Sequence, residues 1–310
     1  MVGSALLREL KKKNYKVLNC RRKDLNFIDQ HSVNKWFKKN KPDIVINAAG
    51  RVGGILDNLV HPSDYIYENT MIGFNLISSS LSNGVKKFIN LGSVSNYPGK
   101  TKIPIRESYW LTSELEKTNE AYAISKISTI KFCEYIKKNL KKEFISLIPA
   151  NLYGTGDNFD LKRSHVIPAL IKKFHIAKVN NSKDVEVWGS GKSMREFLNV
   201  DDLVSAIIFC IKKKIKQNYI NVGSSDYLSI KELSILIKRI VEFKGKIKFN
   251  KNYPDGTLKR KLDTRLLDKL GWKNKISLKE GLSIYYEEFK KNNLWSRFFC
   301  NYYLLKEIIL

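Results

Sequence analysis

Cysteine and proline are scarce in this chain of 310 residues, with four and seven copies. The four cysteines, Cys20, Cys133, Cys210 and Cys300, lie far apart and lack the spacing of zinc ligands. We therefore expect neither a metal site nor a disulfide framework, and a reducing, cytoplasmic location fits best. The chain also has no proline-rich linker or internal repeat that would divide it.

Acidic residues are few as well: 30 Asp and Glu stand against 56 Lys and Arg, for a net charge of +26. Such a charge raises the question of a nucleic-acid or membrane partner. The lysine runs 11–13, 141–142 and 212–214 fall mostly at surfaces or ends of expected helices. Because no arginine pattern interleaved with aromatic residues is present, we expect a solvated basic surface and no nucleic-acid partner.

The sequence lacks a charged leader followed by an apolar stretch and a cleavage site, so secretion has no support. The final segment, 294–310, is aromatic and aliphatic, but it carries Arg297, Lys306 and Glu307 and is shorter than a membrane span. We expect this C-terminal extension to be a helix that packs on the body or on a second subunit. Contact with a membrane surface is the alternative.

Short apolar runs alternate with helical patterns through the first two-thirds of the chain. The expected strands cover residues 15–19, 43–49, 87–93 and 144–150. This rhythm predicts an α/β fold, with a Rossmann-type doubly wound parallel sheet covered by helices on both faces. Ligands of such sheets bind beyond the carboxyl ends of the strands, so the functional residues should follow each run.

The rest of the chain predicts a smaller α/β lobe. The expected strands there cover residues 185–188, 218–224 and 246–249, and helices begin near Asp201 and Ser229. We expect a dinucleotide-binding lobe of residues 1–160 with a returning segment at about 196–224. A substrate-binding lobe would comprise residues 161–195 and 225–293.

The first residues are unusual. Met-Val-Gly-Ser-Ala is typical of the last part of a glycine-rich turn that opens a helix, and Gly3 is its one glycine. A dinucleotide site needs a strand and then glycines that let the backbone approach the pyrophosphate. Close packing of helix on strand is the alternative role for Gly3. We expect that the central first strand is missing, that the true start lies roughly a dozen residues upstream, and that a protein beginning at Met1 is unstable or binds cofactor poorly.

Three short motifs carry the chemistry. Tyr122 and Lys126 are four residues apart on a stretch with helical spacing, so the phenol and the ammonium share one face. The lysine charge should lower the pKa of Tyr122 and make it a usable proton donor. Ser93 ends the strand 87–93, where it can bond a substrate carbonyl or simply cap a turn. Together with Asn47, Ala48 and Ala49, these motifs resemble the short-chain dehydrogenase/reductases.

A narrower resemblance is to the GDP-L-fucose synthase family, which epimerises and reduces GDP-4-keto-6-deoxy-D-mannose. It covers residues 1 to about 290. It rests on the stretches RVGGI (51–55), TNEAYAISK (118–126), NLYGTGDNF (151–159), SHVIPALIKKFH (164–175), VWGSG (187–191) and REFLNVDDL (195–203).

The resemblance implies roles for individual residues. Tyr122 would give a proton to the keto oxygen, Ser93 would hold that oxygen, and Lys126 would bind the nicotinamide ribose. His165, just before an apolar helical run, would be the general acid of the epimerisation, with a capping histidine as the alternative. The implied cofactor contacts are Gly3, Asn47, Ala48, Ala49, Tyr122, Lys126, Pro149, Asn151, Leu152 and His165.

The implied nucleotide contacts are Lys173, Trp188, Arg195 and Arg260. A guanidinium suits a diphosphate and an indole offers a flat surface. The alternatives are core packing for Trp188 and an ordinary exposed lysine for Lys173. The fold analogy also implies a homodimer formed by a helix pair.

NADPH is the expected cofactor. Arg21 and Arg22 follow the strand 15–19, where many NAD enzymes place an acidic residue for the ribose hydroxyl. Two basic residues there favour the 2′-phosphate.

Ser95 departs from the family, which has a cysteine two residues after the serine. A thiol supplies a thiolate base near neutral pH, whereas an unassisted hydroxyl does not. Either another group serves as base, or the protein is mainly a 4-keto reductase of a related GDP-6-deoxy-sugar or GDP-heptose. A catalytically inactive binding protein is a third interpretation.

Overall fold

The main sheet has four parallel strands in the order β1-β2-β3-β7. In this computed structural model, which describes residues 1–21, 23–161 and 163–304 with side chains up to Lys291, these strands are Ile44–Asn47, Lys87–Leu91, Glu143–Pro149 and Tyr219–Val222. The register pairs Ile44 with Lys87 and Ser146 with Tyr219. β2 is buried along its whole length, as expected of a strand with neighbours on both sides. The predicted α/β fold with a parallel sheet is confirmed.

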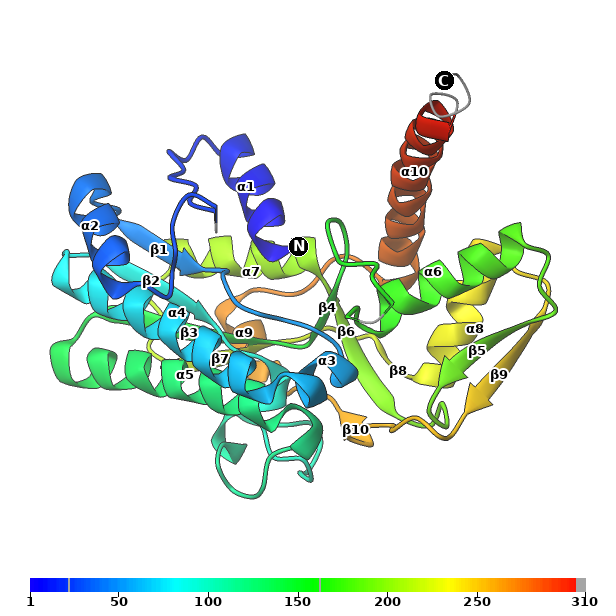
Figure 1. The fold of residues 1–310 in the computed structure, drawn as a ribbon. Coiled ribbons are helices and arrows are strands. Elements are labelled where there is room, and N and C mark those ends of the chain that lie inside the picture. The colour runs from blue at the N-terminus through cyan, green and yellow to red at the C-terminus, as the bar shows by residue number, and fades with distance from the viewer. Residues whose placement is uncertain (22, 162, 305–310) are drawn as a thin grey trace.

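Helices cover both faces of this sheet (Figure 1). One face carries α2 (Gln30–Asn40), α4 (Pro62–Ser82) and α5 (Glu120–Leu140), and the other carries α1 (Val2–Lys12) and α7 (Val200–Lys212). Successive strand residues point to opposite faces. Phe88 and Phe144 accordingly join the core under α2, α4 and α5, whereas Ile89 and Ile145 join the core under α1 and α7.

Residues 15–19 form no strand, so that prediction is wrong. A strand exists through its ladder of hydrogen bonds to a neighbour, and in the described part of the chain β1 pairs with β2 alone. Tyr15 and Val17 still pack against the core beside α1. The apolar pattern of residues 15–19 therefore indicated partial burial of these side chains, but it did not indicate whether the segment pairs with a strand.

A second group of elements lies at the other end of the molecule (Figure 1). β6 pairs with β4, β10 and, antiparallel, β8, while β5 pairs with β9. These strands are β4 (Asn151–Tyr153), β5 (Asp184–Trp188), β6 (Met194–Asn199), β8 (Tyr227–Ser229), β9 (Lys246–Asn250) and β10 (Lys259–Arg260). The helices here are α6 (Val166–Val179), α8 (Ile230–Val241) and α10 (Leu278–Leu304). Side chains such as Phe174, Leu233 and Leu282 form a separate core.

We call the part around the main sheet the large lobe and the part around this separate core the small lobe. The sequence-based boundaries stay a prediction. The cores differ from them, because Leu262, Leu267 and Trp272 pack in the large lobe, whereas Tyr153 and Phe197 pack in the small lobe. The remaining short elements are α3 (Ile55–Val60), α9 (Arg265–Leu270) and the 3₁₀ turns η1 (Val94–Asn96), η2 (Glu107–Tyr109) and η3 (Lys117–Asn119).

The lysine runs lie where they were expected, at the ends of α1, α5 and α7. In residues 1–21, 23–161 and 163–304, no helix is long and apolar enough to cross a membrane. The described residues also contain no group of three or more His, Cys, Asp or Glu that could hold a metal ion. α10 continues into the C-terminal extension and projects from the body (Figure 1), but the predicted packing of residues 294–310 lies outside the described side chains.

One buried carboxylate ties the lobes together. Glu196, on β6, is 1% exposed and accepts hydrogen bonds from the backbone N–H groups of Ser224 and Leu262, both at 2.6 Å. Ser224 follows β7 and Leu262 follows β10, so one side chain holds three segments. Burial raises the pKa of Glu196 to about 7.

Replacing Glu196 by Ala should destabilise the protein by about 3 kcal/mol, because two buried N–H groups lose their acceptors. Urea denaturation of the variant and the parent measures this difference. Glu114→Ala, at an exposed position, is the control and should change stability by less than about 0.5 kcal/mol. Equal stability of Glu196→Ala and parent would show that the link between the lobes is unimportant.

The same carboxyl predicts a pH dependence. Its folded pKa lies above the ordinary value of 4.5, so the folded state holds the proton more tightly than the unfolded state. This contribution to stability is fully present below pH 4.5 and is lost as the pH rises through about 7. The parent should therefore lose stability relative to Glu196→Ala over this window, which denaturation at several pH values tests.

Candidate active site

A cavity of about 640 Å³, within the size range of small-molecule sites, lies where the two lobes meet. The carboxyl end of the main sheet forms one wall. This wall consists of the last residue of β1 with the three residues after it (47–50), the last residue of β2 with the four after it (91–95), and residues 149–152, from the end of β3 to the start of β4. The cavity is lined by all of the cofactor contacts that were expected at these strand ends, namely Asn47, Ala48, Ala49, Pro149, Asn151 and Leu152.

Ser93 is positioned by a tight turn after β2. A Cβ on Gly92 would come within 2.8 Å of the Ile130 Cδ1 atom, so glycine lets the turn pack directly on α5. The Ser93 Oγ atom accepts a hydrogen bond from the Ser95 N–H at 3.2 Å, and the backbone N–H of Ser93 donates to Asn96 Oδ1 at 2.6 Å. Ser93 thus caps η1 and also lines the cavity, so the two roles considered for it are compatible.

Tyr122 and Lys126 project from one face of α5 into the same cavity. The Ser93 side chain lies close enough to the Tyr122 hydroxyl to influence its pKa. The Lys126 Nζ atom lies 5.9 Å from the centre of the Tyr122 ring and donates to the Leu91 carbonyl at 3.1 Å. The structure therefore brings Ser93, Tyr122 and Lys126 together.

The pKa of Tyr122 shifts in the direction opposite to the prediction. Burial raises it to about 12, and the neighbouring Ser93 side chain offsets this in part. Burial also lowers the pKa of Lys126 to about 8, so its positive charge is itself disfavoured here. The spacing of the pair could be read from the sequence, but the depth at which both groups are buried could not.

His165 is the N-cap residue of α6 and lines the cavity, as its place before the apolar run suggested. Burial lowers its pKa, while the Asp157 carboxylate acts in the opposite direction. Asp157 also lines the cavity, and its Oδ2 atom has no hydrogen-bond partner in the described part of the chain. The sequence reasoning missed Asp157, although it lies inside the quoted stretch 151–159.

Of the two arginines expected to select NADPH, Arg21 is not brought to the cavity. Arg21 is exposed, and its Nε atom donates to Asp24 at 2.9 Å. Because residues 15–19 form no strand, the chain after them is not held at the carboxyl edge of the sheet. Arg22 lies outside the described residues. Gly3, in contrast, lines the cavity in the first turn of α1.

The guanidinium groups of Arg195, which is half-buried, and Arg260, which is buried, lie at the small-lobe end of the cavity. Arg195 donates to the carbonyls of Met194 and Asp255 at 3.0 and 3.2 Å. Arg260 donates to the carbonyls of Tyr97 and Pro98, at 3.2 and 2.9 Å. Among the described residues neither forms an ion pair with a carboxylate, although Glu116 lies close enough to influence both.

Burial lowers the pKa of both groups, that of Arg260 to about 10, and Arg195 adds to the shift of Arg260. One buried and one half-buried cation, bonded mainly to neutral groups, favour an anionic ligand.

Trp188 and Lys173 lie beside these arginines and contact each other. The Lys173 Nζ atom is 4.5 Å from the centre of the Trp188 ring and donates to the Glu186 carbonyl at 3.1 Å. Trp188 is 36% exposed, so it is not a core residue. Its ring stacks on Tyr253 at 4.2 Å with an interplanar angle of 9°. The sequence reasoning missed Tyr253, which follows β9 in a polar turn without any motif.

Comparison with known proteins gives the family. Residues 1–223 match the model of the NAD dependent epimerase/dehydratase family. The chain is 44% identical over 292 residues to GDP-L-fucose synthase of Sinorhizobium fredii, covering 94% of this chain and 93% of that protein.

Comparison with solved structures gives the same family. A GDP-6-OMe-4-keto-L-xylo-heptose reductase from Campylobacter jejuni has a TM-score of 0.88 at 35% identity, over 94% of this chain and 95% of that chain. The GDP-mannoheptose C4 reductase MlghC from the same organism, solved with NADP bound, has a TM-score of 0.86 at 35% identity over 93% and 95% of the two chains. The chain therefore belongs to the NAD dependent epimerase/dehydratase family, as a relative of GDP-L-fucose synthase.

Proposed function

We propose that this protein is an NADPH-dependent enzyme of the GDP-L-fucose synthase type, which epimerises carbons 3 and 5 and reduces the 4-keto group of GDP-4-keto-6-deoxy-D-mannose. The observation that carries the proposal is one cavity with two chemically different ends. Ser93, Tyr122 and Lys126 cluster at one end, and the half-buried Arg195 and the buried Arg260 lie at the other. This arrangement suits a sugar ketone linked to a diphosphate.

The residues around the cavity fit a dinucleotide. Met1, Val2 and Gly3 place the N-terminus of α1 at the cavity, and a Cβ on Gly3 would meet no atom within 4 Å. Free N–H groups at a helix N-terminus and open space at a glycine suit a pyrophosphate. Lys126 would hold the nicotinamide ribose, and the reduced nicotinamide would supply the hydride. The choice of NADPH rests on relatives such as MlghC, solved with NADP.

Tyr122 would provide the proton for the reduction. Its raised pKa keeps the phenol protonated at neutral pH, so it can donate to the oxygen on which negative charge develops. The Ser93 hydroxyl, which lines the same cavity beside Tyr122, would hold the same oxygen. A charged Lys126 beside the ring would favour the phenolate that remains after transfer.

The arginines would bind the diphosphate. Arg195 and Arg260 present fixed N–H groups to one end of the cavity, and a diphosphate would compensate charges that are costly to bury alone. Substrate binding would therefore relieve an unfavourable feature of the free protein. Glu116, nearby, limits how much positive potential the pair creates.

Ser95 favours a second candidate, a 4-keto reductase without epimerase activity. Its Oγ atom accepts a hydrogen bond from Asn119 Nδ2 at 3.2 Å, which does not turn a hydroxyl into a base. His165 would still be present as an acid, but epimerisation also needs a group that removes the protons at carbons 3 and 5. The similar solved structures include proteins named as C4 and 4-keto reductases of GDP-heptoses.

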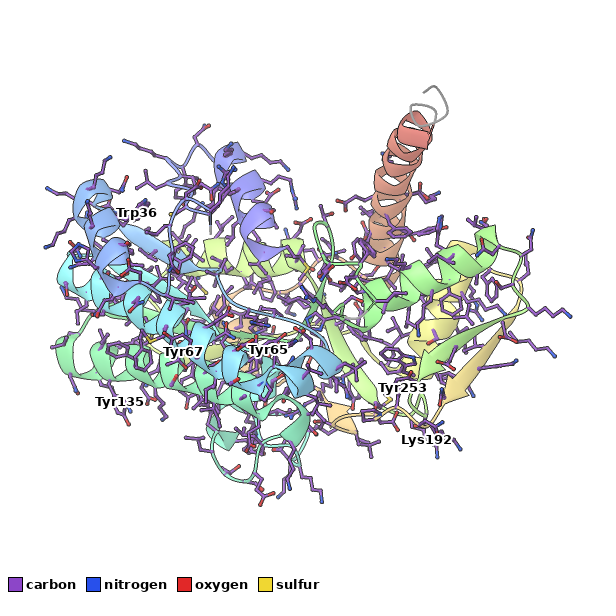
Figure 2. The ribbon with its side chains drawn as sticks, in the orientation of Figure 1. Trp36, Tyr65, Tyr67, Tyr135, Lys192 and Tyr253 are labelled. Carbon is purple, nitrogen blue, oxygen red and sulfur yellow. The ribbon has the colours of Figure 1, made fainter. Side chains whose placement is uncertain are left out.

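A homodimer would bury an apolar surface on α4 and α5. Phe74 and Phe132 bring the two helices together, with ring centres 5.1 Å apart. Figure 2 shows Tyr67 and Tyr135 on the outer side of these helices, where they are 59% and 56% exposed. Ile66 and Ile124 are exposed on the same two helices. Aromatic side chains of this kind favour a subunit contact.

The direct test incubates the protein with NADPH and GDP-4-keto-6-deoxy-D-mannose and identifies the product sugar by NMR. We expect oxidation of NADPH with formation of GDP-L-fucose. Oxidation with a product of unchanged configuration at carbons 3 and 5 would support the reductase alone. Failure to oxidise NADPH with any keto-sugar nucleotide would refute both candidates.

Tyr122→Phe should lower kcat by about 10²- to 10⁴-fold, because the proton donor is lost while the ring remains. The dissociation constant of NADPH should stay within about two-fold, since the phenol acts on the ketone and not on cofactor affinity. Tyr135→Phe, on the outer side of the same helix, is the control and should keep the parent kcat. Parent-like turnover by Tyr122→Phe would remove Tyr122 from the mechanism.

Deuterium incorporation from solvent at carbons 3 and 5 decides the role of Ser95. With a serine here, exchange should be slow, and Ser95→Cys should raise its rate at least about ten-fold, because a thiol with a pKa near 8.5 supplies a thiolate. The exchange rate is measured by NMR without NADPH. Rapid exchange by the parent would instead identify another base and support the full epimerase and reductase.

Phe74→Glu combined with Tyr135→Glu should convert a dimer into a monomer, because two carboxylates per subunit would be buried in the contact. Light scattering after size-exclusion chromatography measures the mass. Val179→Glu, at an exposed apolar position on α6, is the control. A parent protein that is monomeric at micromolar concentration would contradict the proposed dimer.

A further inference from the structure

Both faces of the Trp188 ring are already covered by this chain's own side chains. Tyr253 stacks on the indole in a nearly parallel arrangement, with ring centres 4.2 Å apart. The Lys173 Nζ atom lies 4.5 Å from the indole centre. Since a ring stacked at van der Waals distance leaves no room for a cation on its own side, Lys173 covers the opposite face. The indole therefore offers no free face for a nucleotide base to stack on.

Tyr253 has one face against Trp188, and it also lines the cavity. Figure 2 shows it on the connection between β9 and β10, on the small lobe. Its half-buried ring can therefore present its second face to a ligand. An aromatic pair that served only to fill a core would be buried from solvent, whereas Trp188 is 36% exposed and both rings line the cavity.

The loop that carries Tyr253 is anchored on both sides. Asp255 accepts from the Ser190 N–H through its Oδ1 atom at 2.7 Å, and its carbonyl accepts from Ser193 Oγ at 3.0 Å. Further along, Thr257 Oγ1 donates to Glu116 of the large lobe at 2.8 Å. These bonds hold the ring in place before a ligand arrives, which reduces the entropy lost on binding.

The same loop reaches Arg195, the half-buried cation of the pair. The carbonyl of Asp255, two residues after Tyr253, accepts from Arg195 Nη2 at 3.2 Å. A diphosphate held by Arg195 would thus place its nucleoside beside the Tyr253 ring. Phosphate recognition and base recognition would come from neighbouring positions on one fixed segment.

We propose that Tyr253, through the face turned away from Trp188, is the platform on which the purine base of the nucleoside diphosphate stacks, with Trp188 and Lys173 as its support. This inference rests on the proposed function, since it assumes a nucleotide-linked substrate. It makes Tyr253 a determinant of nucleotide specificity, because a purine overlaps a phenol ring more extensively than a pyrimidine does.

The test is calorimetric titration of the full chain with GDP and, separately, with UDP. Tyr253→Ala should weaken GDP binding about ten-fold, which is the scale of one lost base–aromatic stack, and should weaken UDP binding less. Tyr253→Phe keeps the ring and should bind GDP like the parent. NADPH affinity and thermal stability of each variant show whether the fold is intact.

The outcomes separate the inference from the proposed function. A parent that binds no GDP refutes the nucleotide-sugar function and the inference with it. A parent that binds GDP, together with a Tyr253→Ala variant of equal affinity, refutes the platform alone. A Tyr253→Ala variant that loses GDP, UDP and NADPH affinity equally, with a lower melting temperature, would show that the stack is only structural.

Discussion

The contact between α5 and the carboxyl end of β2 is the interaction on which the rest of the site depends. Gly92 allows Ile130 to approach the backbone, and Lys126 donates to the last carbonyl of β2 at 3.1 Å. In the turn that follows β2, Asn96 Nδ2 donates to the Ala123 carbonyl of α5 at 3.0 Å. Together these contacts fix the rotation and height of α5, and so they decide that a phenol from the helix meets a hydroxyl from the strand end.

The small lobe adds the second end of the cavity and is held in place by polar contacts. Glu196 bonds two backbone N–H groups across the lobes, and Thr257 bonds Glu116. Polar contacts of this kind have strict geometry, whereas apolar packing tolerates sliding. The distance between the Tyr122 end and the Arg195 end is therefore defined by specific hydrogen bonds, which matters for a substrate that must occupy both.

The site carries a cost in stability that a ligand would offset. Lys126, Arg195 and Arg260 are cations whose pKa values burial lowers, and Asp157 is a carboxyl group whose pKa burial raises. Each shift means that the charged form is less stable here than in water. Such groups are retained where a charge is needed at a fixed point, and a bound diphosphate would restore favourable partners for the two arginines.

The sequence by itself determined what depends on local periodicity and spacing. It gave the parallel sheet, the strand ends that carry Asn47, Ser93 and Asn151, and the helical pair Tyr122 and Lys126, because a strand or a helix turn repeats within a few residues. Tertiary structure alone decided the rest. Residues 15–19 are not a strand, since pairing needs a neighbour. The pKa of Tyr122 rises, since burial is set by the whole fold. Tyr253 meets Trp188 from 65 residues away, since β5 and β9 pair, and no pattern along the chain records which distant segments will become neighbours.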